Sequence, residues 1–335
     1  MLEKNIRKFS ELIIMPDFSV IIVSFNTQDQ ILNCLASIFG QLNGVDGEIF
    51  VVDNNSTDGT PQTIKEKYPS LQLIANHENL GFAKANNLAI KRASGKYIIL
   101  LNSDTILKSC FFDQVIQFME SRQDVGIAGC LLRNTDGSVQ TSAYANYPGI
   151  LTEIVGYSFL NVFLNRVSPF RKYPGKYALS PEEHQRAQEV AHVTGACMII
   201  RKQVFDDVGL FDENFFMYRE ETDLCKRTSE KGWKIYLYPS VEVIHHHKQS
   251  SKKLSDRGVN YRMTSHYLYF QKHYGIILTG VSYGLAIFLS VFQVMILWLA
   301  KVLGLQKENE RLYYFSLILQ WHMRKLPVLC FGGEK

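Results

Sequence analysis

Acidic and amide side chains follow an apolar segment in the N-terminal third of the chain, where they could bind a polar ligand. The run Glu48–Asp53 ends on a carboxylate and is followed by Asn54, Asn55, Ser56 and Asp58. A carboxylate at a strand end can accept hydrogen bonds from a base N–H or a ribose hydroxyl, which fixes a nucleoside without a metal. The alternative is that Asp53 or Asp58 caps the next helix. We favour ligand binding for Asp53, which lies at the strand end itself, and capping for Asp58.

A second acidic group follows the apolar run Lys96–Asn102, which leads into Ser103 and Asp104. Asp104 can ligate Mg²⁺ or Mn²⁺, because both ions prefer oxygen ligands and often complete their coordination with substrate phosphates. As a turn residue it would be unremarkable. Its place after a strand, like that of Asp53, favours a metal ligand.

Three consecutive histidines at positions 245–247 follow the extended segment Val241–Ile244. Successive side chains of an extended chain alternate faces, so the three cannot all bind one metal. One of them is a candidate metal ligand, and the others are expected to face solvent or form hydrogen bonds.

A cluster of acids follows an aromatic run in the second half of the chain. The sequence from Phe215 to Tyr218 is aromatic-rich, and Glu220, Glu221 and Asp223 come directly after Arg219. A carboxylate among aromatic side chains is partly desolvated, which raises its pKa towards that of a general base. The alternative is a helix N-terminus whose acids complement the helix dipole. Both interpretations can hold at once.

Several familiar site motifs are missing from the sequence. There is no GxGxxG after a strand, no GxxxxGK[ST] phosphate loop and no GxSxG nucleophile elbow. These absences argue against a dinucleotide-binding fingerprint, a Walker-type nucleotide site and a hydrolase. What remains is a set of carboxylates and amides at strand ends.

Buried strands that alternate with helices must position these residues. Strands are predicted at Phe18–Ser24, Glu48–Asp53, Leu71–Ala75 and Lys96–Asn102, with helices from Gln28 to about Phe39, from about Pro61, and at Gly81–Ala93. Strands that are apolar throughout and alternate with helices indicate a parallel sheet built from right-handed βαβ units. Ligands of such sheets bind beyond the carboxyl ends of the strands, so the polar clusters are expected on one rim.

The second half of the chain has a mixed pattern. Its predicted elements are a helix at Lys108–Arg122, a hairpin turn at Asn134–Gly137 between Ile127–Leu132 and Ser138–Tyr144, an irregular substrate loop at Tyr147–Pro181, a strand at Val193–Ile200, a helix near Glu221–Lys231 and a strand at Lys234–Tyr238. The turn rests on Asp136-Gly137, a strong hairpin signal.

An uncharged segment runs from Gly275 to Ala300, with basic residues on both sides. A helix of this length is ample for the hydrocarbon core of a membrane. Cations on both flanks do not support a simple single crossing, and Gly280 and Gly284 could let the segment break and re-enter. Leu312–Met323 is too short to span and suits an interfacial helix. The alternative, a buried core helix of a soluble protein, is disfavoured because the uncharged stretch is so long.

The chain has 335 residues, of which 46% are hydrophobic and 20% charged, and this composition excludes collagen, a disordered chain and a disulfide-rich miniprotein. A net charge of only +4 gives no reason to expect a nucleic acid as partner. The six cysteines show no CxxC pair, which indicates reduced thiols in the cytosol rather than a zinc site. The first 16 residues are predicted to form a basic amphipathic segment.

Seven motifs in order resemble family 2 glycosyltransferases of the GT-A fold, and most closely their bacterial rhamnosyltransferase-like branch. They are Val20–Asn26, Val51–Thr60, Asn79–Asn87, Leu100–Thr105, Val193–Arg201, Val208–Asp223 and His245–Ser251. The resemblance covers roughly residues 17–251. It implies an α/β fold with a GT-A-type, Rossmann-like mixed sheet flanked by helices, followed by a C-terminal membrane-associated helical region.

The resemblance also implies roles for single residues. Donor binding is carried over to Ser24, Asn26, Asp53, Asn55, Gly81, Asn87, Asn102 and Asp104, metal binding to Asp104 and His245, and contacts with the sugar or acceptor to Gly195, Ala196 and Asp223. Glu221 would be the general base, with Glu220 beside it. The family usually has Asp where Glu221 stands, which leaves open which of the two glutamates is the base.

The resemblance implies an inverting transfer of a sugar, in the presence of Mg²⁺ or Mn²⁺, from a dTDP- or UDP-linked donor. The leading hypothesis is transfer of L-rhamnose from dTDP-rhamnose to a polyprenyl-diphosphate-linked saccharide in cell-surface polysaccharide assembly. The enzyme would sit on the cytoplasmic face of the cell membrane, with membrane lipid as a further partner. Alternatives are a processive polysaccharide synthase and a nucleotide-sugar-binding assembly protein without turnover. We expect three divisions: an N-terminal amphipathic segment at 1–16, a glycosyltransferase domain at 17–251, and a C-terminal helical, membrane-associated region at 252–335. Within the glycosyltransferase domain, residues 17–105 would form the nucleotide-sugar half and residues 106–251 the acceptor half.

Overall fold

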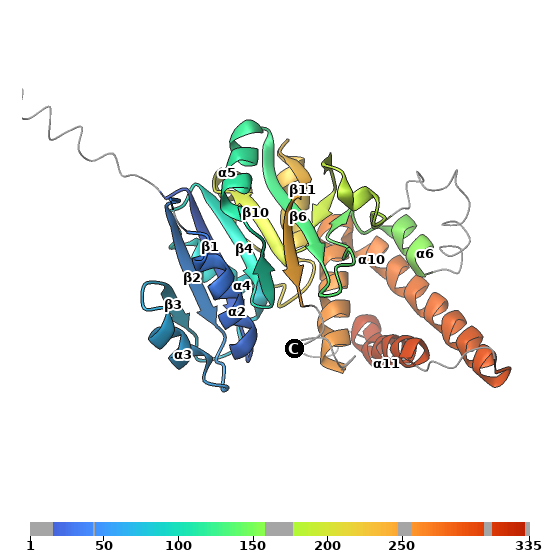
Figure 1. Ribbon diagram of the computed structural model, residues 1–335. Helices are drawn as coiled ribbons and strands as arrows, with labels where there is room; N and C mark the ends of the chain where they lie inside the picture. The colour runs from blue at the N-terminus through green and yellow to red at the C-terminus, as the bar shows by residue number, and fades with distance from the viewer. Residues whose placement is uncertain (1–15, 43, 158–176, 247–255, 305–309, 332–335) are drawn as a thin grey trace, which may run out of the picture.

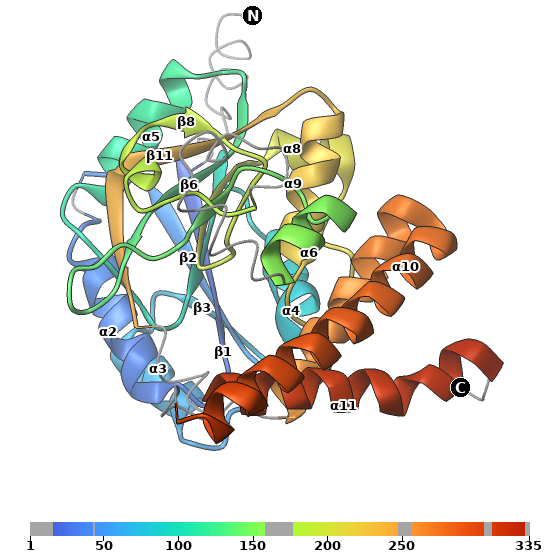
Figure 2. The ribbon, with the colours of Figure 1, turned by 90° about the vertical axis from the view of Figure 1, so that its right-hand side faces the viewer.

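The computed structural model describes residues 16–42, 44–157, 177–246, 256–304 and 310–331 (Figure 1). The amphipathic segment predicted for residues 1–16 therefore lies almost entirely outside the described residues, as does His247. The described residues form a sheet flanked by helices, with a group of C-terminal helices packed against one side (Figures 1 and 2).

The N-terminal half forms the predicted parallel sheet. Its strands are β1 (Phe18–Ser24), β2 (Gly47–Asp53), β3 (Gln72–Ala75) and β4 (Tyr97–Asn102), in the spatial order β3-β2-β1-β4. The connecting helices are α2 (Gln28–Phe39), α3 (Thr60–Lys67) and α4 (Gly81–Ile90). Ser24 pairs with Asp53, and Val23 pairs with Asn102, so the ends of β1, β2 and β4 lie level at one rim. The expected shared rim is confirmed.

The sheet becomes mixed in the second half. An antiparallel strand, β10 (Cys197–Arg201), lies between β4 and β6 (Val125–Arg133). The strand β11 (Lys234–His245) runs parallel to β6 and antiparallel to β5 (Thr105–Leu107), and the short β8 (Gln188–Glu189) pairs with its edge. The mixed α/β sheet inferred from the family resemblance is confirmed.

The helices form a layer on each face of the sheet. Side chains of β1 alternate between the two core clusters, with Val20 and Ile22 on one face and Ile21 on the other. One cluster contains side chains of α2, α3 and α5 (Phe111–Ser121), and the other contains side chains of α4, α8 (Gln203–Val208) and α9 (Glu220–Glu230). Because β1 is buried on both faces, its apolar run has no polar alternation.

Two strand predictions need correction. The segment Val193–Ile200 is not one strand: β9 (His192–Val193) pairs with β7 (Ala143–Tyr144) in a separate small sheet, and β10 begins at Cys197. Lys234–Tyr238 and Val241–Ile244 are instead parts of the single strand β11, which is interrupted by an irregularity between Tyr238 and Glu242.

The predicted turn at Asn134–Gly137 is present, since the Gly137 amide donates to Asn134 O at 2.9 Å and the Asn134 amide to Ser138 O at 2.8 Å. The hairpin stops early, with a single bridge from Arg133 to Val139. Much of β6 is already paired with β10 on one edge and with β11 on the other. The chain after Val139 therefore cannot continue pairing with β6, and its strand β7 pairs with β9 instead.

The C-terminal region contains α10 (Asp256–Val302) and α11 (Glu310–Phe331). The helix α6 (Ile150–Tyr157) packs against α10 and lies within the segment Tyr147–Pro181, so the expectation of irregular structure is wrong there; a short 3₁₀ turn, η2 (Glu183–Gln185), follows later in the chain. Our expectation of a break at Gly280 or Gly284 is wrong: α10 is non-helical only at Gly275, where φ is 77°. Gly275 tolerates that conformation because it lacks a Cβ. The expected interfacial helix Leu312–Met323 is part of the longer α11. Gly275 divides α10 into a first arm (256–274) and a second, apolar arm (276–302). Helix α11 contacts both arms: Trp321 Nε1 donates to Asn260 Oδ1 of the first arm at 2.9 Å, and Tyr283 Oη of the second arm donates to His322 O.

Candidate active site

Hydrogen bonds between side chains and backbone tie together the loops that follow β1, β2 and β4. Ser24 Oγ lies 3.0 Å from Thr27 Oγ1, which donates to Ser103 Oγ at 3.0 Å. Asn26 donates its backbone amide to Ser56 Oγ at 2.8 Å. Its φ of 52° is left-handed, a conformation that asparagine tolerates better than most residues. Ser24 and Asn26 therefore hold the rim together as well as lining it.

Asp53 has a buried carboxyl with one oxygen available to a ligand. Its side chain is 1% exposed, and Oδ2 accepts a hydrogen bond from the Ser56 amide at 2.8 Å. Within the part of the chain that the structure describes, Oδ1 has no hydrogen-bond partner. A buried, unsatisfied carboxylate oxygen is costly, so it favours an incoming N–H or O–H donor. Asn55 is exposed next to it, in a left-handed conformation with φ of 65°.

Asp58 forms bonds that position the neighbouring loops. Its Oδ1 accepts from the Thr60 amide at 3.1 Å, and its Oδ2 from the Gln28 amide at 3.0 Å. Both partners lie at helix N-termini, where backbone amides lack partners within the helix. Asp58 therefore satisfies first-turn amides of α2 and α3, close to the capping role predicted from sequence, although the N-cap residues themselves are Thr27 and Gly59.

Asp104 and His245 converge at the ends of β4 and β11, with Asp104 Oδ1 3.2 Å from His245 Nε2. Two ligands of an octahedral ion with bonds of about 2.1 Å lie about 3 Å apart, so the pair fits a divalent metal. Asn102 Nδ2 lies 3.4 Å from the same nitrogen. No group of three or more His, Cys, Asp or Glu side chains with metal-site geometry occurs among the described residues. The protein therefore offers two ligands, and a diphosphate would supply others.

Gln140 fixes the orientation of the His245 ring, a role that the sequence analysis did not predict. The Gln140 amide nitrogen donates to Asn134 Oδ1 and to His245 O, both at 2.7 Å, so its oxygen faces His245 Nδ1 at 2.9 Å. An amide oxygen only accepts, so Nδ1 carries a proton, and the tautomer that this contact selects has the lone pair on Nε2 that a metal would require. The sequence carries no signal for this contact, because the two residues are 105 positions apart.

Gly195 and Ala196 lie between the rim of β1, β2 and β4 and the glutamate Glu221. The Asn102 amide donates to Ala196 O at 3.0 Å. A Cβ placed on Gly195 would lie 3.4 Å from the Phe82 ring and 4.0 Å from Glu221 Cβ. Any larger side chain at position 195 would fill the space between the donor half and Glu221.

Gly81 allows the N-terminus of α4 to lie close to Phe216, in the aromatic segment that precedes Glu220 and Glu221 in the sequence. A Cβ at Gly81 would lie 2.3 Å from Phe216 O, and its φ is 78°. Both facts require glycine at this position. The Phe82 amide donates to Phe216 O at 2.7 Å and Gly81 O accepts from Asn54 Nδ2 at 3.1 Å, so Gly81 joins both halves of the site.

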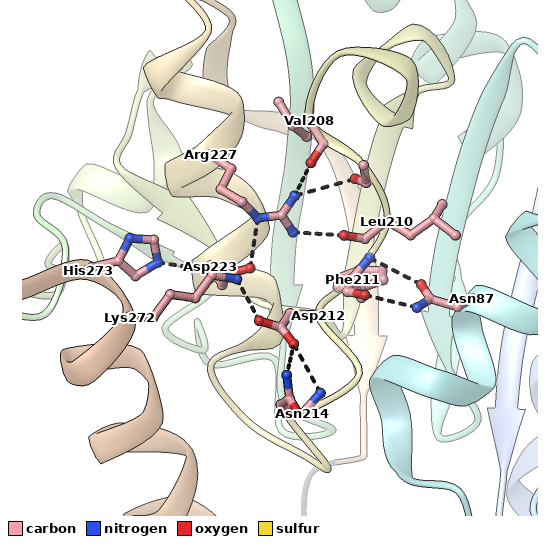
Figure 3. Close-up of polar contacts among 11 residues, drawn as sticks. Asn87, Val208, Leu210, Phe211, Asp212, Asn214, Asp223, Arg227, Lys272 and His273 are labelled. Atoms are coloured by element: carbon pink, nitrogen blue, oxygen red, sulfur yellow. Dashed lines mark hydrogen bonds and ion pairs between the residues drawn. The ribbon is translucent and has the colours of Figure 1, made fainter. Parts of the chain in front are cut away.

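Asn87 was expected to border the donor, but its side-chain amide is hydrogen-bonded to the loop before α9. Its Nδ2 donates to Phe211 O at 2.9 Å, and its Oδ1 accepts from the Phe211 amide at 3.1 Å (Figure 3). Nδ2 also donates to Glu213 Oε1 at 3.0 Å. The side chain is buried with both polar atoms occupied. Asn87 therefore holds the loop that precedes the catalytic helix rather than contacting a ligand.

Glu220 and Glu221 begin helix α9. Glu220 is 4% exposed, and its Oε2 has no partner among the described residues. Burial and the charge of Glu221 hold the pKa of Glu220 well above its usual range, so this side chain favours the protonated form. Glu221 is less buried, and burial also raises its pKa; its Oε1 accepts from Thr222 Oγ1 at 3.1 Å. The partly exposed Glu221, which faces Gly195, has the better geometry for a general base.

Asp223 was expected to contact the acceptor, but it is instead an internal ion-pair centre. It is fully buried and accepts from Arg227 Nε at 2.9 Å, Lys272 Nζ at 2.9 Å and His273 Nε2 at 2.8 Å (Figure 3). Burial alone would raise the pKa of Asp223, but the hydrogen bond from His273 and the charges of Arg227 and Lys272 lower it to about 2. Asp223 anchors α9 to the first arm of α10.

The chain matches known glycosyltransferases in sequence and structure. Residues 19–209 match the model of the family described as glycosyl transferase family 2. The chain is 31% identical over 214 residues to the N-acetylglucosaminyl-diphospho-decaprenol L-rhamnosyltransferase of Mycobacterium tuberculosis, covering 61% of this chain and 67% of that protein. It is 24% identical to the rhamnosyltransferase WbbL of Escherichia coli K12, covering 76% and 92% respectively.

A solved structure shows the same fold. The mannosyltransferase of Pyrobaculum calidifontis, in complex with GDP-Man and Mn²⁺, matches 95% of this chain and 88% of its own chain with a TM-score of 0.53 at 14% identity. The family match covers more than half of the sequence and includes the rim formed by β1, β2 and β4. The chain therefore belongs to glycosyl transferase family 2 and is a glycosyltransferase with a GT-A-type fold.

Proposed function

We propose that the enzyme transfers L-rhamnose, with inversion, from dTDP-rhamnose to a hydroxyl of a polyprenyl-diphosphate-linked saccharide during cell-surface polysaccharide assembly. The observation that carries this proposal is the convergence of the Asp104–His245 pair, Gly195 and Glu221 at one rim of the sheet. The named rhamnosyltransferases of Mycobacterium tuberculosis and Escherichia coli support the choice of sugar.

Asp53, Asp104 and His245 form the proposed donor site. The unsatisfied Oδ1 of Asp53 accepts a hydrogen bond from the nucleoside, and Ser24, Asn26 and Asn55 shape the surrounding loops. Asp104 and His245 would hold Mg²⁺ or Mn²⁺, and Asn102 lies beside them. A metal held there would neutralise the charge that develops on the diphosphate leaving group. Gln140 keeps His245 in the tautomer that binding requires.

Glu221 is the proposed general base. It removes the proton from the acceptor hydroxyl as that oxygen attacks the anomeric carbon, while the bond to the diphosphate breaks. A single in-line displacement inverts the configuration and needs no covalent intermediate on the enzyme. Glu220, whose buried carboxyl favours the protonated form, supports the position of Glu221 instead of acting as a second base.

The second arm of α10 supports attachment to a membrane. Helix α10 is long and apolar enough to cross a bilayer. Its buried residues after the kink are mostly small or polar, and Ser282 Oγ donates to Glu153 Oε1 of α6 at 2.8 Å. Its exposed residues are large and apolar: Ile276, Ile277, Leu278, Val281, Phe288, Val291, Phe292, Met295, Trp298, Leu299 and Val302. This distribution is the reverse of that in a helix of a soluble protein, so the exposed face suits lipid.

We further propose a division of the chain into three functional parts. A nucleotide-sugar half at 17–105 and an acceptor half at 106–251 form the catalytic domain, and the helical region at 252–335 attaches it to the cytoplasmic face of the membrane. Exposed basic residues on both sides of the apolar arm, including Arg257 and Lys301, suit an anionic membrane surface.

The proposal is tested by incubating the full-length protein with dTDP-L-rhamnose, Mn²⁺ and N-acetylglucosaminyl-diphospho-decaprenol. One rhamnose is expected per acceptor, and UDP-glucose and GDP-mannose are expected to give no product. Transfer from another sugar nucleotide alone would replace the donor assignment. Addition of many sugars per acceptor would favour the processive alternative.

A further inference from the structure

A group of stacked aromatic rings stands beside the catalytic acids and has no place in the donor site. Tyr144 and His192 are cross-strand partners in the small sheet of β7 and β9, with ring centroids 4.3 Å apart and planes inclined by 8°. Tyr177 completes the group, with its ring 4.6 Å from that of Tyr144. We refer to Tyr144, Tyr177 and His192 as the aromatic platform.

The backbone holds the platform rigidly. The Ala145 amide donates to Tyr177 O at 2.9 Å, and the Ala191 amide donates to Tyr144 O at 2.8 Å. His192 is 1% exposed, and neither of its ring nitrogens has a hydrogen-bond partner within the described ranges. Burial lowers the pKa of His192 well below its usual value, so the ring is neutral and supports Tyr144 by stacking. Tyr144 and Tyr177 are only partly buried and form the accessible part.

Arg219 supplies hydrogen-bond donors at the edge of the platform. Its Nη1 donates to Tyr177 Oη at 2.5 Å, and its guanidinium carbon lies 5.7 Å from the centre of that ring. This is the single hydrogen bond that the arginine side chain forms with described residues, although a guanidinium has five N–H groups. Arg219 and Tyr218 both have left-handed backbone conformations, with φ of 69° and 71°. Such strain in two successive non-glycine residues is typical of functional sites.

The platform lies on the acceptor side of Glu221. Strand β9 leads through Thr194 to Gly195, whose Cβ position is 4.0 Å from Glu221 Cβ, and the Thr194 amide donates to Ser142 O at 2.9 Å. On the side of the C-terminal helices, Tyr274 of α10 donates to Pro148 O at 2.6 Å, just before α6. The platform is thus connected through β9 to the segment beside Glu221, and the chain that follows Tyr144 reaches Pro148, which contacts α10.

We propose that Tyr144, Tyr177 and Arg219 form the acceptor-sugar subsite of this enzyme. The C–H groups of a pyranose ring pack on the tyrosine rings, and the unused guanidinium N–H groups donate to hydroxyl or phosphate oxygens of the same acceptor. His192 is not part of this subsite but stacks on the Tyr144 ring and holds it in place. This inference rests on the proposed transferase function and adds the surface that recognises the sugar which receives the transfer.

The test is the steady-state kinetics of the full-length protein, with N-acetylglucosaminyl-diphospho-decaprenol and dTDP-L-rhamnose each varied in turn. Tyr144→Ala, Tyr177→Ala and Arg219→Ala are each expected to raise KM for the acceptor about tenfold, with KM for the donor unchanged. Tyr144→Phe keeps the ring and is expected to recover most of the loss seen in Tyr144→Ala. Arg122→Ala is the matched control, since Arg122 also lies over a tyrosine ring, at 4.7 Å from Tyr236, away from the catalytic acids.

Two further measurements separate the possible outcomes. The acceptor-independent hydrolysis of dTDP-L-rhamnose reports on the donor site alone, and it is expected to persist in each variant. Comparison with an acceptor that lacks the diphosphate and lipid shows whether Arg219 contacts the sugar or the phosphate: an equal loss for both acceptors places its contact on the sugar. An unchanged acceptor KM in folded variants of an active enzyme would overturn the subsite. An inactive wild-type protein would instead contradict the proposed function.

Discussion

Glu221 and Glu220 are adjacent acids in different surroundings. Glu220 is almost fully buried, whereas Glu221 is partly exposed beside Gly195. Proton transfer requires a carboxylate within reach of the substrate hydroxyl, which favours Glu221.

Replacement of the base should separate the two glutamates. Glu221→Gln is expected to lower kcat by about 10²–10⁴-fold, because the amide cannot accept the proton. Glu220→Gln keeps the neutral character that burial imposes on this side chain, so it is expected to retain most of the activity. Single-turnover measurement of sugar transfer checks this result. A larger loss in Glu220→Gln than in Glu221→Gln would exchange the two roles.

The pH dependence of kcat should reflect the environment of Glu221. Burial raises its pKa above the usual 4.5, and only the deprotonated form acts as a base. Activity is therefore expected to fall as the pH decreases through this raised value, so the acidic limb lies above pH 4.5. The kcat profile of the wild type is the measurement, and Asp124→Asn, which changes an exposed carboxylate far from the rim loops, is the control and should keep the wild-type profile. An acidic limb below that pH would contradict the assignment.

Gln140 should affect metal binding without contacting the metal. Gln140→Leu frees the His245 ring and is expected to weaken the apparent affinity for Mn²⁺ about 10–100-fold. Activity should be lost in EDTA and return as Mn²⁺ is titrated, with a higher midpoint in the variant. Gln188→Leu on the edge strand β8 is the matched control. Equal midpoints for all three proteins would exclude this role.

Some site residues could be predicted from sequence and others could not. Asp53 and Asp104 end apolar strands, and parallel pairing brings strand ends to one rim, so their placement follows from local pattern. Asn87 and Asp223 were given ligand roles, yet their partners are Phe211 and Lys272, at long distance along the chain. No local pattern encodes such pairings.

At the level of elements, the first arm of α10 fixes the catalytic helix. Lys272 bridges Asp223 of α9 and Asp212 of the preceding loop, at 2.9 and 2.7 Å (Figure 3). Ser265 donates to Met217 O at 2.7 Å, close to the catalytic acids. The helix that leads towards the membrane therefore also positions Glu221.

Loss of this ion-pair centre should destabilise the protein. Asp223→Asn leaves the cations of Arg227 and Lys272 without their buried carboxylate partner, and it is expected to cost about 3 kcal/mol of unfolding free energy. The measurement is denaturant unfolding in detergent, together with kcat. Asp124→Asn is the matched control, because Asp124 binds Arg122 and Lys234 at an exposed site and little change is expected. Equal effects of the two substitutions would show that Asp223 has no special role.

The elements themselves were predictable where one physical signal dominates. The buried strands β1, β2 and β4 appear as continuous apolar runs. The break in α10 was misplaced because Gly275, Gly280 and Gly284 look alike in sequence. The break occurs where the first arm ends its contacts with α9 and the apolar arm turns towards α6 and α11.

At the level of the whole molecule, the apolar face of α10 should control membrane binding. The triple variant Ile277→Asn, Phe288→Ser, Trp298→Gln changes exposed side chains and is expected to move the protein from the membrane pellet to the supernatant. A triple change on the exposed face of α3, Gln62→Ser, Lys65→Ser, Glu66→Ser, is the control. Unchanged sedimentation of the α10 variant would exclude this face as the membrane contact.

The most direct test of the central claim is the configuration of the new glycosidic bond formed from dTDP-L-rhamnose by the wild type, Glu221→Gln and Asp104→Asn. A single displacement with Glu221 as base predicts that NMR of the wild-type product shows the anomeric configuration opposite to that of the donor. It also predicts that both variants form product far more slowly. A product with retained configuration, or unimpaired transfer by both variants, would contradict the account.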